Sequence, residues 1–528
     1  MGAPGTSADS HWHPRHNPWL IAFSVMLATF MEVLDTSVAN VSLPHIAGNL
    51  SATTEESTWV LTSYLIANAI VLPTTAWLGG VMGRRRFLLL CIALFTLSSA
   101  LCGAAANLGF LVLARILQGA SGGALQPISQ AVLLESFPPA KRGQAMAVFA
   151  MGVVVAPIVG PTLGGWITDN FSWRWIFYIT LPVGGLAWVM ARSFVEDPPY
   201  LHRVSFRSLD GLGFVFLVLW LSSLQILLDR GQQEDWFESR FMIACAAVSL
   251  LSMVAFVARE LTTRHPLVDL RVFRNRNFAV GVCLMTMLGA VLYASTAILP
   301  LFMQTLLGYS ALQAGLALSP RGLGAFAMTV LVGRIVGVVS SRLLITFGFI
   351  LLGVSSFLLG TISLGVDLPH LVELSIINGI SLAFIFVPLT TTTMGTLAQR
   401  QMGNAAGIFN LMRNLGGSIG IAVVTSLLAR GTQVHHALLS AQAHSLNPAF
   451  RERLGAVEGL FTRYTGDPVA ASARATKLLD GLVTAQASHL SFVDNFRLFG
   501  ITCFVFLPTI WLLKNVRPGK GGPGLGGH

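Results

Sequence analysis

Charged residues are scarce in this chain. They make up only 11% of its 528 residues, whereas hydrophobic residues make up 54% and the mean hydropathy is +0.70. A water-soluble domain carries about 25% charged residues, so these side chains cannot cover a soluble surface of this size. The same figures exclude an intrinsically disordered chain, which needs low hydrophobicity and high net charge. The sequence therefore predicts an integral membrane protein that is embedded in a lipid bilayer.

Paired cysteines and metalloprotease or nucleotide-binding motifs are also missing. The five cysteines fall inside apolar segments without CxxC or metal-ligand spacing, so we expect neither a disulfide scaffold nor a metal site. An HExxH pattern and a P-loop are absent from the sequence, which disfavours a membrane-embedded enzyme and ATP as the energy source. The net charge of +10 comes mostly from arginines at the ends of apolar segments, a pattern that orients helices in a membrane rather than binding nucleic acid.

Long apolar stretches recur along the whole chain. About 20 apolar residues cross roughly 30 Å of hydrocarbon, and a backbone in lipid must be helical to satisfy its own polar groups. We therefore predict an all-α integral membrane protein with fourteen transmembrane helices. The predicted spans are 19–40, 57–78, 87–105, 110–134, 144–168, 173–195, 209–228, 241–260, 278–306, 310–333, 343–365, 370–396, 402–429 and 494–514.

Basic residues alternate between the predicted connecting loops. Every second loop carries arginine or lysine, as in the run from Arg84 to Arg86 and the pair Lys141 and Arg142, whereas most of the intervening loops carry none. Basic loops remain on the cytoplasmic side of a membrane. We therefore expect a multi-pass protein with both termini in the cytoplasm and a first helix that is not cleaved.

The predicted helices divide into groups of six, two and six. Polar and basic stretches flank the two helices between about 209 and 260, as expected for an insert between two bundles. A long loop, 431–493, precedes the last helix and is expected on the periplasmic side. The predicted parts are a cytoplasmic tail (1–18), a six-helix bundle (19–195), a two-helix insert with flanking loops (196–277), a second six-helix bundle (278–514) and a glycine-rich cytoplasmic tail (515–528).

The first predicted span carries two acidic residues, Glu32 and Asp35. A charge at the bilayer centre costs about 2.5–3.5 kcal/mol on insertion scales, so such residues indicate function. Three residues apart on a helix, the two carboxylates share one face, and they cannot both ionise cheaply. We expect them to load and unload a proton, with Arg115 as the partner of Asp35 and Arg413 as a second buried cation. A static ion pair that only ties two helices together is the alternative.

The fifth predicted span combines prolines with small residues. Proline leaves a helix carbonyl unpaired and bends the helix, and glycine lets helix backbones approach closely. This pattern favours a tightly packed helix that bends as two bundles rock against each other. The residues are Pro157, Gly160, Pro161, Gly164 and Gly165.

Several segments together resemble one known family. R-I-L-Q-G-A-S-G-G from Arg115 is similar to the fourth-helix motif of major facilitator drug exporters, and G-P-T-L-G-G from Gly160 resembles their antiporter motif. L-D-T-S-V-A-N-V-S-L-P from Leu34 and W-R-W-I-F-Y-I-T-L-P-V-G from Trp173 resemble signatures of the fourteen-helix drug:proton antiporters. L-D-R-G-Q-Q-E-D-W-F from Leu228 resembles the EmrB-like subfamily, and the resemblance covers nearly the whole chain.

The resemblance implies a major facilitator fold of two six-helix bundles plus two inserted helices. It implies a proton-coupled multidrug efflux antiporter of the bacterial inner membrane that exports amphiphilic toxic compounds by alternating access. No cofactor is implied, because the proton gradient would drive transport. The implied partners are a periplasmic membrane-fusion adaptor of the EmrA type and an outer-membrane channel like TolC, which would form a tripartite system with this chain.

Family roles carry over at the matching positions. Asp35 would couple protons, Arg115 would be the buried arginine of the fourth helix, and the proline and glycine residues of the fifth span would form the bending element. The chain departs from the family at Gly80, where the family pattern has an aspartate in the cytoplasmic turn after the second helix. A gate lock based on that acid is therefore in doubt.

Polar and aromatic residues on helices expected to face the centre are candidates for a substrate cavity. An exporter dedicated to one physiological substrate, such as a siderophore, a fatty acid or an aromatic acid, is the alternative function, and a membrane-embedded enzyme is less favoured. The cavity candidates are Thr36, Asn40, Tyr64, Gln126, Tyr293, Gln304, Asn378 and Phe384.

Overall fold

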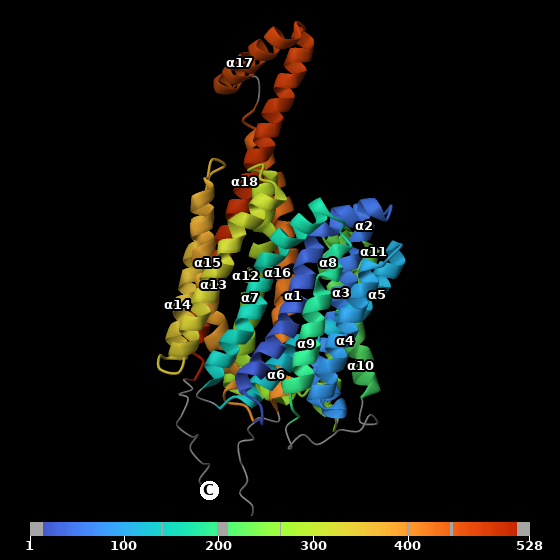
Figure 1. The fold of residues 1–528 in the computed structure, drawn as a ribbon. Helices are drawn as coiled ribbons and strands as arrows, with labels where there is room; N and C mark the ends of the chain where they lie inside the picture. The colour runs from blue at the N-terminus through green and yellow to red at the C-terminus, as the bar shows by residue number, and fades with distance from the viewer. Residues whose placement is uncertain are drawn as a thin grey trace, which may run out of the picture.

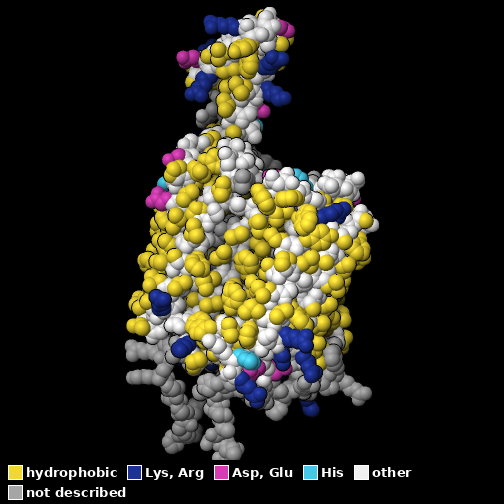
Figure 2. Space-filling model, in the orientation of Figure 1, with side chains coloured by type: hydrophobic (Ala, Val, Ile, Leu, Met, Phe, Trp, Pro, Cys, Tyr) yellow, Lys and Arg dark blue, Asp and Glu magenta, His cyan; other side chains and the backbone are white. Residues whose placement is uncertain are grey.

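The computed structural model describes residues 14–138, 141–197, 210–264, 266–398, 401–443 and 447–514, which form helices and no strands (Figure 1). Fourteen helical segments in these ranges, two of them made of two consecutive helices, are long and apolar enough to cross a membrane. The predicted all-α membrane fold and the number of spans are therefore confirmed. Figure 2 shows hydrophobic side chains spread over the visible face of the body of the molecule.

The first part of the chain forms one group of helices, called here the first group. Its members are α1 (Pro18–Asn49), α2 (Thr54–Ser57), α3 (Trp59–Met82), α4 (Arg84–Gly103), α5 (Leu108–Gly122), α6 (Leu125–Ser136), α7 (Arg142–Asn170), α8 (Trp175–Tyr178) and α9 (Thr180–Phe194). Within this group α1 packs against α7 and α9, and α5 packs against α3 and α4.

Two predicted spans of the first group are each divided into two helices. The fourth span becomes α5 and α6, and the sixth becomes α8 and α9. A proline lies near the start of the second helix in each case, at Pro127 and Pro182. Because proline has no backbone N–H, it cannot donate to the carbonyl four residues earlier, and the helix is interrupted there.

The last part of the chain forms the second group. Its members are α12 (Arg276–Thr305), α13 (Ala311–Ile335), α14 (Ser341–Leu359), α15 (Leu368–Met394), α16 (Met402–Ser440), α17 (Pro448–Thr465) and α18 (Pro468–Ile510). Here α12 packs against α16, and α13 packs against α15. The same pairing of first with fifth and second with fourth spans therefore occurs in both groups, as expected for parallel repeats.

Two helices lie between these groups in the sequence. They are α10 (Gly211–Arg230) and α11 (Arg240–Thr262), which pack against each other. Asp210 caps α10 by accepting a hydrogen bond from the Gly213 backbone N–H at 3.2 Å, and it pairs with Arg259 of α11 at 2.8 Å. The hydrogen bond from Arg259 holds the pKa of Asp210 below its ordinary value. This ion pair ties the pair of helices together at one end.

The segment predicted as a long loop, 431–493, is largely helical. It consists of the end of α16, all of α17 and the first half of α18, and it projects beyond the body as a hairpin (Figure 1). Asn447 and Asp467 cap α17 and α18, and each is followed by a proline in the first helical turn. The segment is polar, so hydropathy gave no signal for these helices. We call this face of the molecule the hairpin side.

The opposite face is called the terminus side, because α1 begins there and α18 ends there (Figure 1). The two groups meet along α7 and α13 and along α3 and α16. Towards the terminus side, Gly407 of α16 lies against the backbone of Leu72 and Pro73 in α3. Asn410 of α16 also donates a hydrogen bond to Gln130 of α6 at 2.8 Å. These contacts hold the groups together on the terminus side.

Candidate functional site

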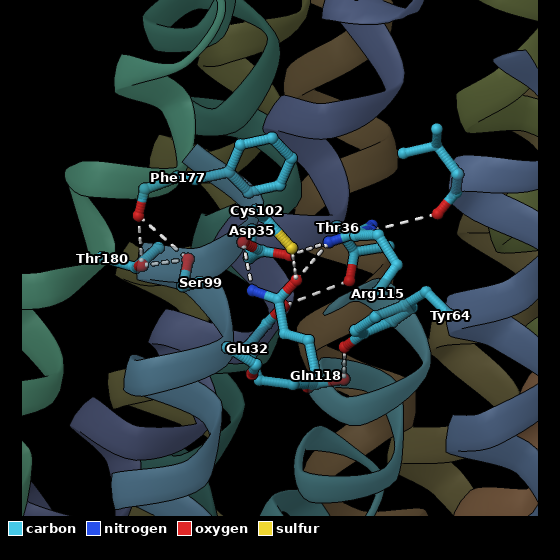
Figure 3. A network of polar contacts seen from close by, with 12 residues as sticks. Glu32, Asp35, Thr36, Tyr64, Ser99, Cys102, Arg115, Gln118, Phe177 and Thr180 are labelled. Carbon is cyan, nitrogen blue, oxygen red and sulfur yellow. Dashed lines mark hydrogen bonds and ion pairs between the residues drawn. The ribbon is translucent and has the colours of Figure 1, made fainter. Parts of the chain in front are cut away.

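Asp35 of α1 and Arg115 of α5 form an ion pair in the interior of the first group (Figure 3). The Arg115 Nη1 atom lies 2.6 Å from Asp35 Oδ2. Arg115 is fully buried, and Asp35 is only 2% exposed. The structure thus brings together the two residues that the sequence pairs. Taking both charges out of water is costly, so such a pair needs further hydrogen bonds.

Those further contacts come from α5 itself and from the neighbouring helix α3. Gln118 accepts a hydrogen bond from Arg115 at 2.7 Å and donates one to the other Asp35 oxygen at 2.8 Å, which closes a triangle (Figure 3). Arg115 Nε donates to the Val60 carbonyl at 3.0 Å, and the guanidinium lies 4.5 Å from the centre of the Tyr64 ring. Sequence reasoning missed Gln118, although it lies one helical turn after Arg115 in the same motif.

Glu32, one turn before Asp35 on α1, has a different environment. Its carboxylate accepts hydrogen bonds from Tyr64 Oη at 3.1 Å, from Asn68 at 3.3 Å and from Gln126 at 2.6 Å. All three donors are neutral, whereas Asp35 is bound by a cation. Tyr64 takes part in both sites, because its hydroxyl bonds Glu32 while its ring lies beside Arg115.

Arg413 of α16 faces Glu32 from the second group through a neutral amide. Its Nη2 atom donates to the Gln126 side-chain oxygen, whose amide nitrogen donates to Glu32. Arg413 is buried, and it also donates to Asn414 at 3.3 Å. Asn414 in turn contacts Asn68 at 3.5 Å. Opposite charges on the two groups are therefore connected by one glutamine side chain.

A central cavity lies between the two groups and includes Glu32 in its wall. Five of the predicted cavity residues line it: Thr36, Asn40, Tyr64, Gln126 and Tyr293. Residues that sequence reasoning did not propose also line it, among them Asn68, Gln225, Thr296, Asn414 and Ser418. The wall therefore combines a few polar groups with apolar side chains, which is the usual composition of a small-molecule site.

Three of the residues predicted to line a cavity are not among those that line this one. Gln304 is exposed near the hairpin-side end of α12. Asn378 and Phe384 are buried in α15, where the Phe384 ring packs 4.9 Å from the Phe347 ring of α14. They do not reach the cavity because α15 packs mainly against α13 and α14. A single sequence shows that a residue is apolar or polar, but not which neighbour its helix face meets.

The proline and glycine residues of the fifth span lie on α7, which is one continuous helix packed along α1. Gly160 and Gly164 lie against Ser37 and Val38, where a larger side chain would collide with α1. Pro161 removes the helical donor of the Pro157 carbonyl. Ser37 supplies a replacement by donating to that carbonyl at 3.2 Å.

Two residues of this proline and glycine set differ in their relation to the cavity. Pro157 lines the cavity, whereas Gly165 is buried outside it. This part of α7 therefore packs along α1 and, at Pro157, also lines the cavity. Among the residues that the structure describes, no group of three or more His, Cys, Asp or Glu side chains is placed to hold a metal ion.

A comparison of the sequence with known protein families shows which family the chain belongs to. Residues 25–421 match the family model described as Major Facilitator Superfamily. The chain belongs to the major facilitator superfamily. This superfamily member is 40% identical over 440 residues to the multidrug export protein EmrB of Haemophilus influenzae. The aligned region covers 81% of this chain and 84% of the relative. It is therefore also EmrB-like.

Two further relatives extend over nearly the whole of this major facilitator protein. The multidrug export protein EmrB of Escherichia coli K12 is 35% identical over 514 residues, with 96% of this chain and 98% of the relative covered. The fatty acid resistance protein FarB of Neisseria gonorrhoeae is 35% identical over 504 residues, with 95% and 97% covered. The likeness therefore includes the insert and the hairpin as well as the two groups.

Solved structures agree with the major facilitator fold. A double-tryptophan mutant of XylE superposes with a TM-score of 0.59 at 14% identity, covering 95% of this chain and 97% of that chain. The human organic anion transporter MFSD10 gives a TM-score of 0.57 at 15% identity, covering 93% and 100%. At these identities the likeness shows the fold alone.

Proposed function

We propose that this chain is a proton-coupled multidrug efflux antiporter that exports amphiphilic toxic compounds by alternating access of its central cavity. Relatives named as multidrug export proteins match it over most of their length, which supports the efflux class. The observation that carries the proposal is the placement of two carboxylates one turn apart on α1. One lies in the cavity wall, and the other is ion-paired behind it.

Asp35 is the first proposed proton carrier. When Asp35 is ionised, its charge balances that of Arg115 in the buried interior of the first group. When a proton neutralises Asp35, the buried guanidinium loses its counter-charge, a change that costs about 3–5 kcal/mol when a buried pair is broken. Helices α1 and α5 must then rearrange to supply new partners. Proton binding therefore favours one conformation over another, as coupling requires.

Glu32 is the second proposed carrier, and it acts between the two groups. Ionised Glu32 attracts Arg413 through Gln126, and protonation removes that attraction. Because α1 and α16 belong to different groups, the charge on Glu32 changes how firmly the groups are held together at the cavity. Cargo is exchanged for protons if a bound proton favours the conformation in which Glu32 and Arg413 are apart and bound cargo favours the one in which they are connected, or the reverse.

Transport by purified protein in proteoliposomes tests the proposal. An imposed pH gradient should drive accumulation of a fluorescent amphiphile by the native protein, and a sodium gradient of equal size should not. Asp35→Asn should fold and insert but lose gradient-driven transport, because its amide cannot carry a proton. Glu32→Gln should lose it as well.

The matched control is Asp367→Asn, an exposed aspartate before α15, which should transport like the native protein. If Asp35→Asn pumps as well as the native protein, Asp35 is not the coupling residue. If the sodium gradient drives transport and the pH gradient does not, the proposal of proton coupling is wrong, whereas the proposal of an efflux transporter is retained.

We further propose that the protein lies in the bacterial inner membrane with both termini in the cytoplasm, so that the hairpin projects into the periplasm. There it would meet an EmrA-like membrane-fusion adaptor, with a TolC-like channel completing a tripartite system. The projection of α17 and the outer half of α18 supports this, because helices beyond the body are free to contact a partner (Figure 1). Removing the hairpin tip, residues 441–470, should abolish co-purification with the adaptor and cellular resistance, yet leave proteoliposome transport intact.

Export of one physiological substrate, a fatty acid, is the second candidate. The relative FarB is named as a fatty acid resistance protein and matches over nearly its whole length. A panel of unrelated amphiphiles separates the two functions. A multidrug exporter should move several of them in the proteoliposome assay, whereas a dedicated exporter should move long-chain fatty acids alone.

A further inference from the structure

The inserted helix α10 contributes to the central cavity. Gln225 of α10 lines it together with residues of both six-span groups. The helix reaches this position because it packs against α3 of the first group and α16 of the second. The insert therefore contributes to the wall of the same cavity as the two six-span groups.

The side chain of Gln225 is held in one orientation. Its amide nitrogen donates to Asp229 Oδ1 at 3.2 Å, and its amide oxygen accepts from Ser418 Oγ of α16 at 3.2 Å. Thr62 of α3 also hydrogen-bonds Asp229. The amide therefore has fixed partners on two sides, and it connects α3, through Asp229, with α16, through Ser418.

The end of α10 is anchored to both groups as well. Arg230 donates to Thr58 at 3.4 Å and lies 4.6 Å from the centre of the Trp59 ring, which belongs to the first group. Trp236, just after α10, donates to Ser426 of α16 at 3.1 Å. These contacts hold the hairpin-side end of α10 against both α3 and α16. They keep Gln225 at the cavity rather than at the lipid.

The amide keeps unused hydrogen-bonding capacity in this arrangement. A glutamine amide has two N–H donors and two lone pairs on its oxygen, and here one of each is engaged by Asp229 and Ser418. One donor and one acceptor remain for a molecule in the cavity. A wall that hydrogen-bonds a cargo discriminates against analogues that lack the matching group more strongly than an apolar wall does.

We propose that Gln225 is a specificity-determining residue of the cavity, supplied by the inserted helix, and that Asp229 is the residue that positions its amide. The inference rests on the proposed export function and adds the recognition of cargo with hydrogen-bonding groups. Gln225 selects for amphiphiles that carry an amine, hydroxyl or carbonyl group near their apolar body. Cargo without such groups gains nothing from it.

Two lipophilic cations that differ in hydrogen bonding test this. Ethidium carries two amino groups, whereas tetraphenylphosphonium carries no hydrogen-bonding group. In proteoliposomes with an imposed pH gradient, Gln225→Leu should raise the KM for ethidium by about five-fold, the effect of one lost hydrogen bond. Its kcat should stay near the native value, and the KM for tetraphenylphosphonium should change by less than about two-fold.

Variants of the positioning residue and of a neighbour complete the experiment. Asp229→Leu should raise the KM for ethidium in the same direction as Gln225→Leu, whereas Asp229→Asn keeps an acceptor for the amide and should restore most of the native value. Gln233→Leu, an exposed glutamine just after α10, is the matched control and should leave both cargoes unaffected. Equal melting temperatures in detergent show that the variants are folded.

The failure of this inference differs from the failure of the proposed function. Equal changes for both cations, or no change for either, would overturn the role of Gln225 and leave proton-driven export standing. If the native protein moves neither cation against its gradient, export of such compounds fails. Equilibrium dialysis of the two cations against native and Gln225→Leu protein then decides the specificity role, because an unchanged ratio of affinities contradicts it.

Discussion

The two carboxylates of α1 lie one turn apart but in different surroundings. Asp35 binds a cation of its own group, away from the cavity, within a closed set of charged and amide partners. Glu32 lies in the cavity wall, binds neutral donors and faces its cation across the interface between the groups. The first site is therefore local to one half of the protein, and the second connects the two halves.

In the proposed mechanism this difference assigns different tasks to the two carboxylates. A carboxylate with a direct buried counter-charge strongly resists a change of protonation unless helices move, so it suits the coupling of a proton to conformation. Glu32 lines the cavity although it is only 4% exposed, so cargo in the cavity lies closer to Glu32 than to Asp35. Tyr64 touches both, so the state of one site can influence the other.

The largest expected effect concerns the ion pair. Arg115→Met leaves Asp35 buried without a counter-charge and should destabilise the protein by about 3–5 kcal/mol. Thermal unfolding in detergent, followed by tryptophan fluorescence, measures the loss. The double variant Arg115→Met with Asp35→Leu should regain most of it, because no buried charge remains. If Arg115→Met alone is as stable as the native protein, the ion pair between Arg115 and Asp35 does not stabilise the fold.

The packing behind α1 should affect both sites at once. Gly160→Val places methyl groups against Ser37 and should cost about 1–3 kcal/mol, the usual effect of overpacking. Because α1 carries Glu32 and Asp35, transport should fall together with stability. Gly185→Val is the control, since no neighbouring side chain or helix lies within 4 Å of an added Cβ there. If both variants behave alike, close approach of α7 to α1 is unnecessary.

Removing the bridge between the groups should affect transport more than folding. Gln126→Leu disconnects Glu32 from Arg413, and we expect gradient-driven transport to fall about tenfold, equivalent to 1.4 kcal/mol. Gln130→Leu, which breaks an uncharged bond between the groups, is the matched control and should have a smaller effect. Equal losses would mean that the bridge matters as a contact and not through its charges.

The smallest effect should come from the residue shared by both sites. Tyr64→Phe removes one donor to Glu32 but keeps the ring beside Arg115, so it should cost about 1 kcal/mol and reduce transport a few-fold. Tyr64→Leu removes both contacts and should also destabilise the ion pair. Transport and melting temperature, measured on both variants, distinguish the contributions. Identical results for the two would show that the ring contributes nothing.

Parts of the site could be predicted because charge in a membrane is expensive. Asp35 and Arg115 each needed a partner, and their positions along two helices made the pairing a reasonable prediction. Burial cost did not single out Gln118, Asn68 and Gln225, because an uncharged amide can be buried at many positions with a small free-energy cost. Their roles depend on which helix faces which, and periodicity within one helix does not contain that information.

The sequence by itself determined the medium, the fold class and the number of spans. Scarce charge and fourteen long apolar stretches leave helices in a bilayer as the only way to satisfy the backbone. Tertiary structure alone decided that Glu32 lines the cavity, that Gln126 connects it to Arg413 and that α10 supplies Gln225 to the wall. The physical reason is that hydropathy is a property of each segment, whereas a cavity is formed by the relative rotation and packing of several segments.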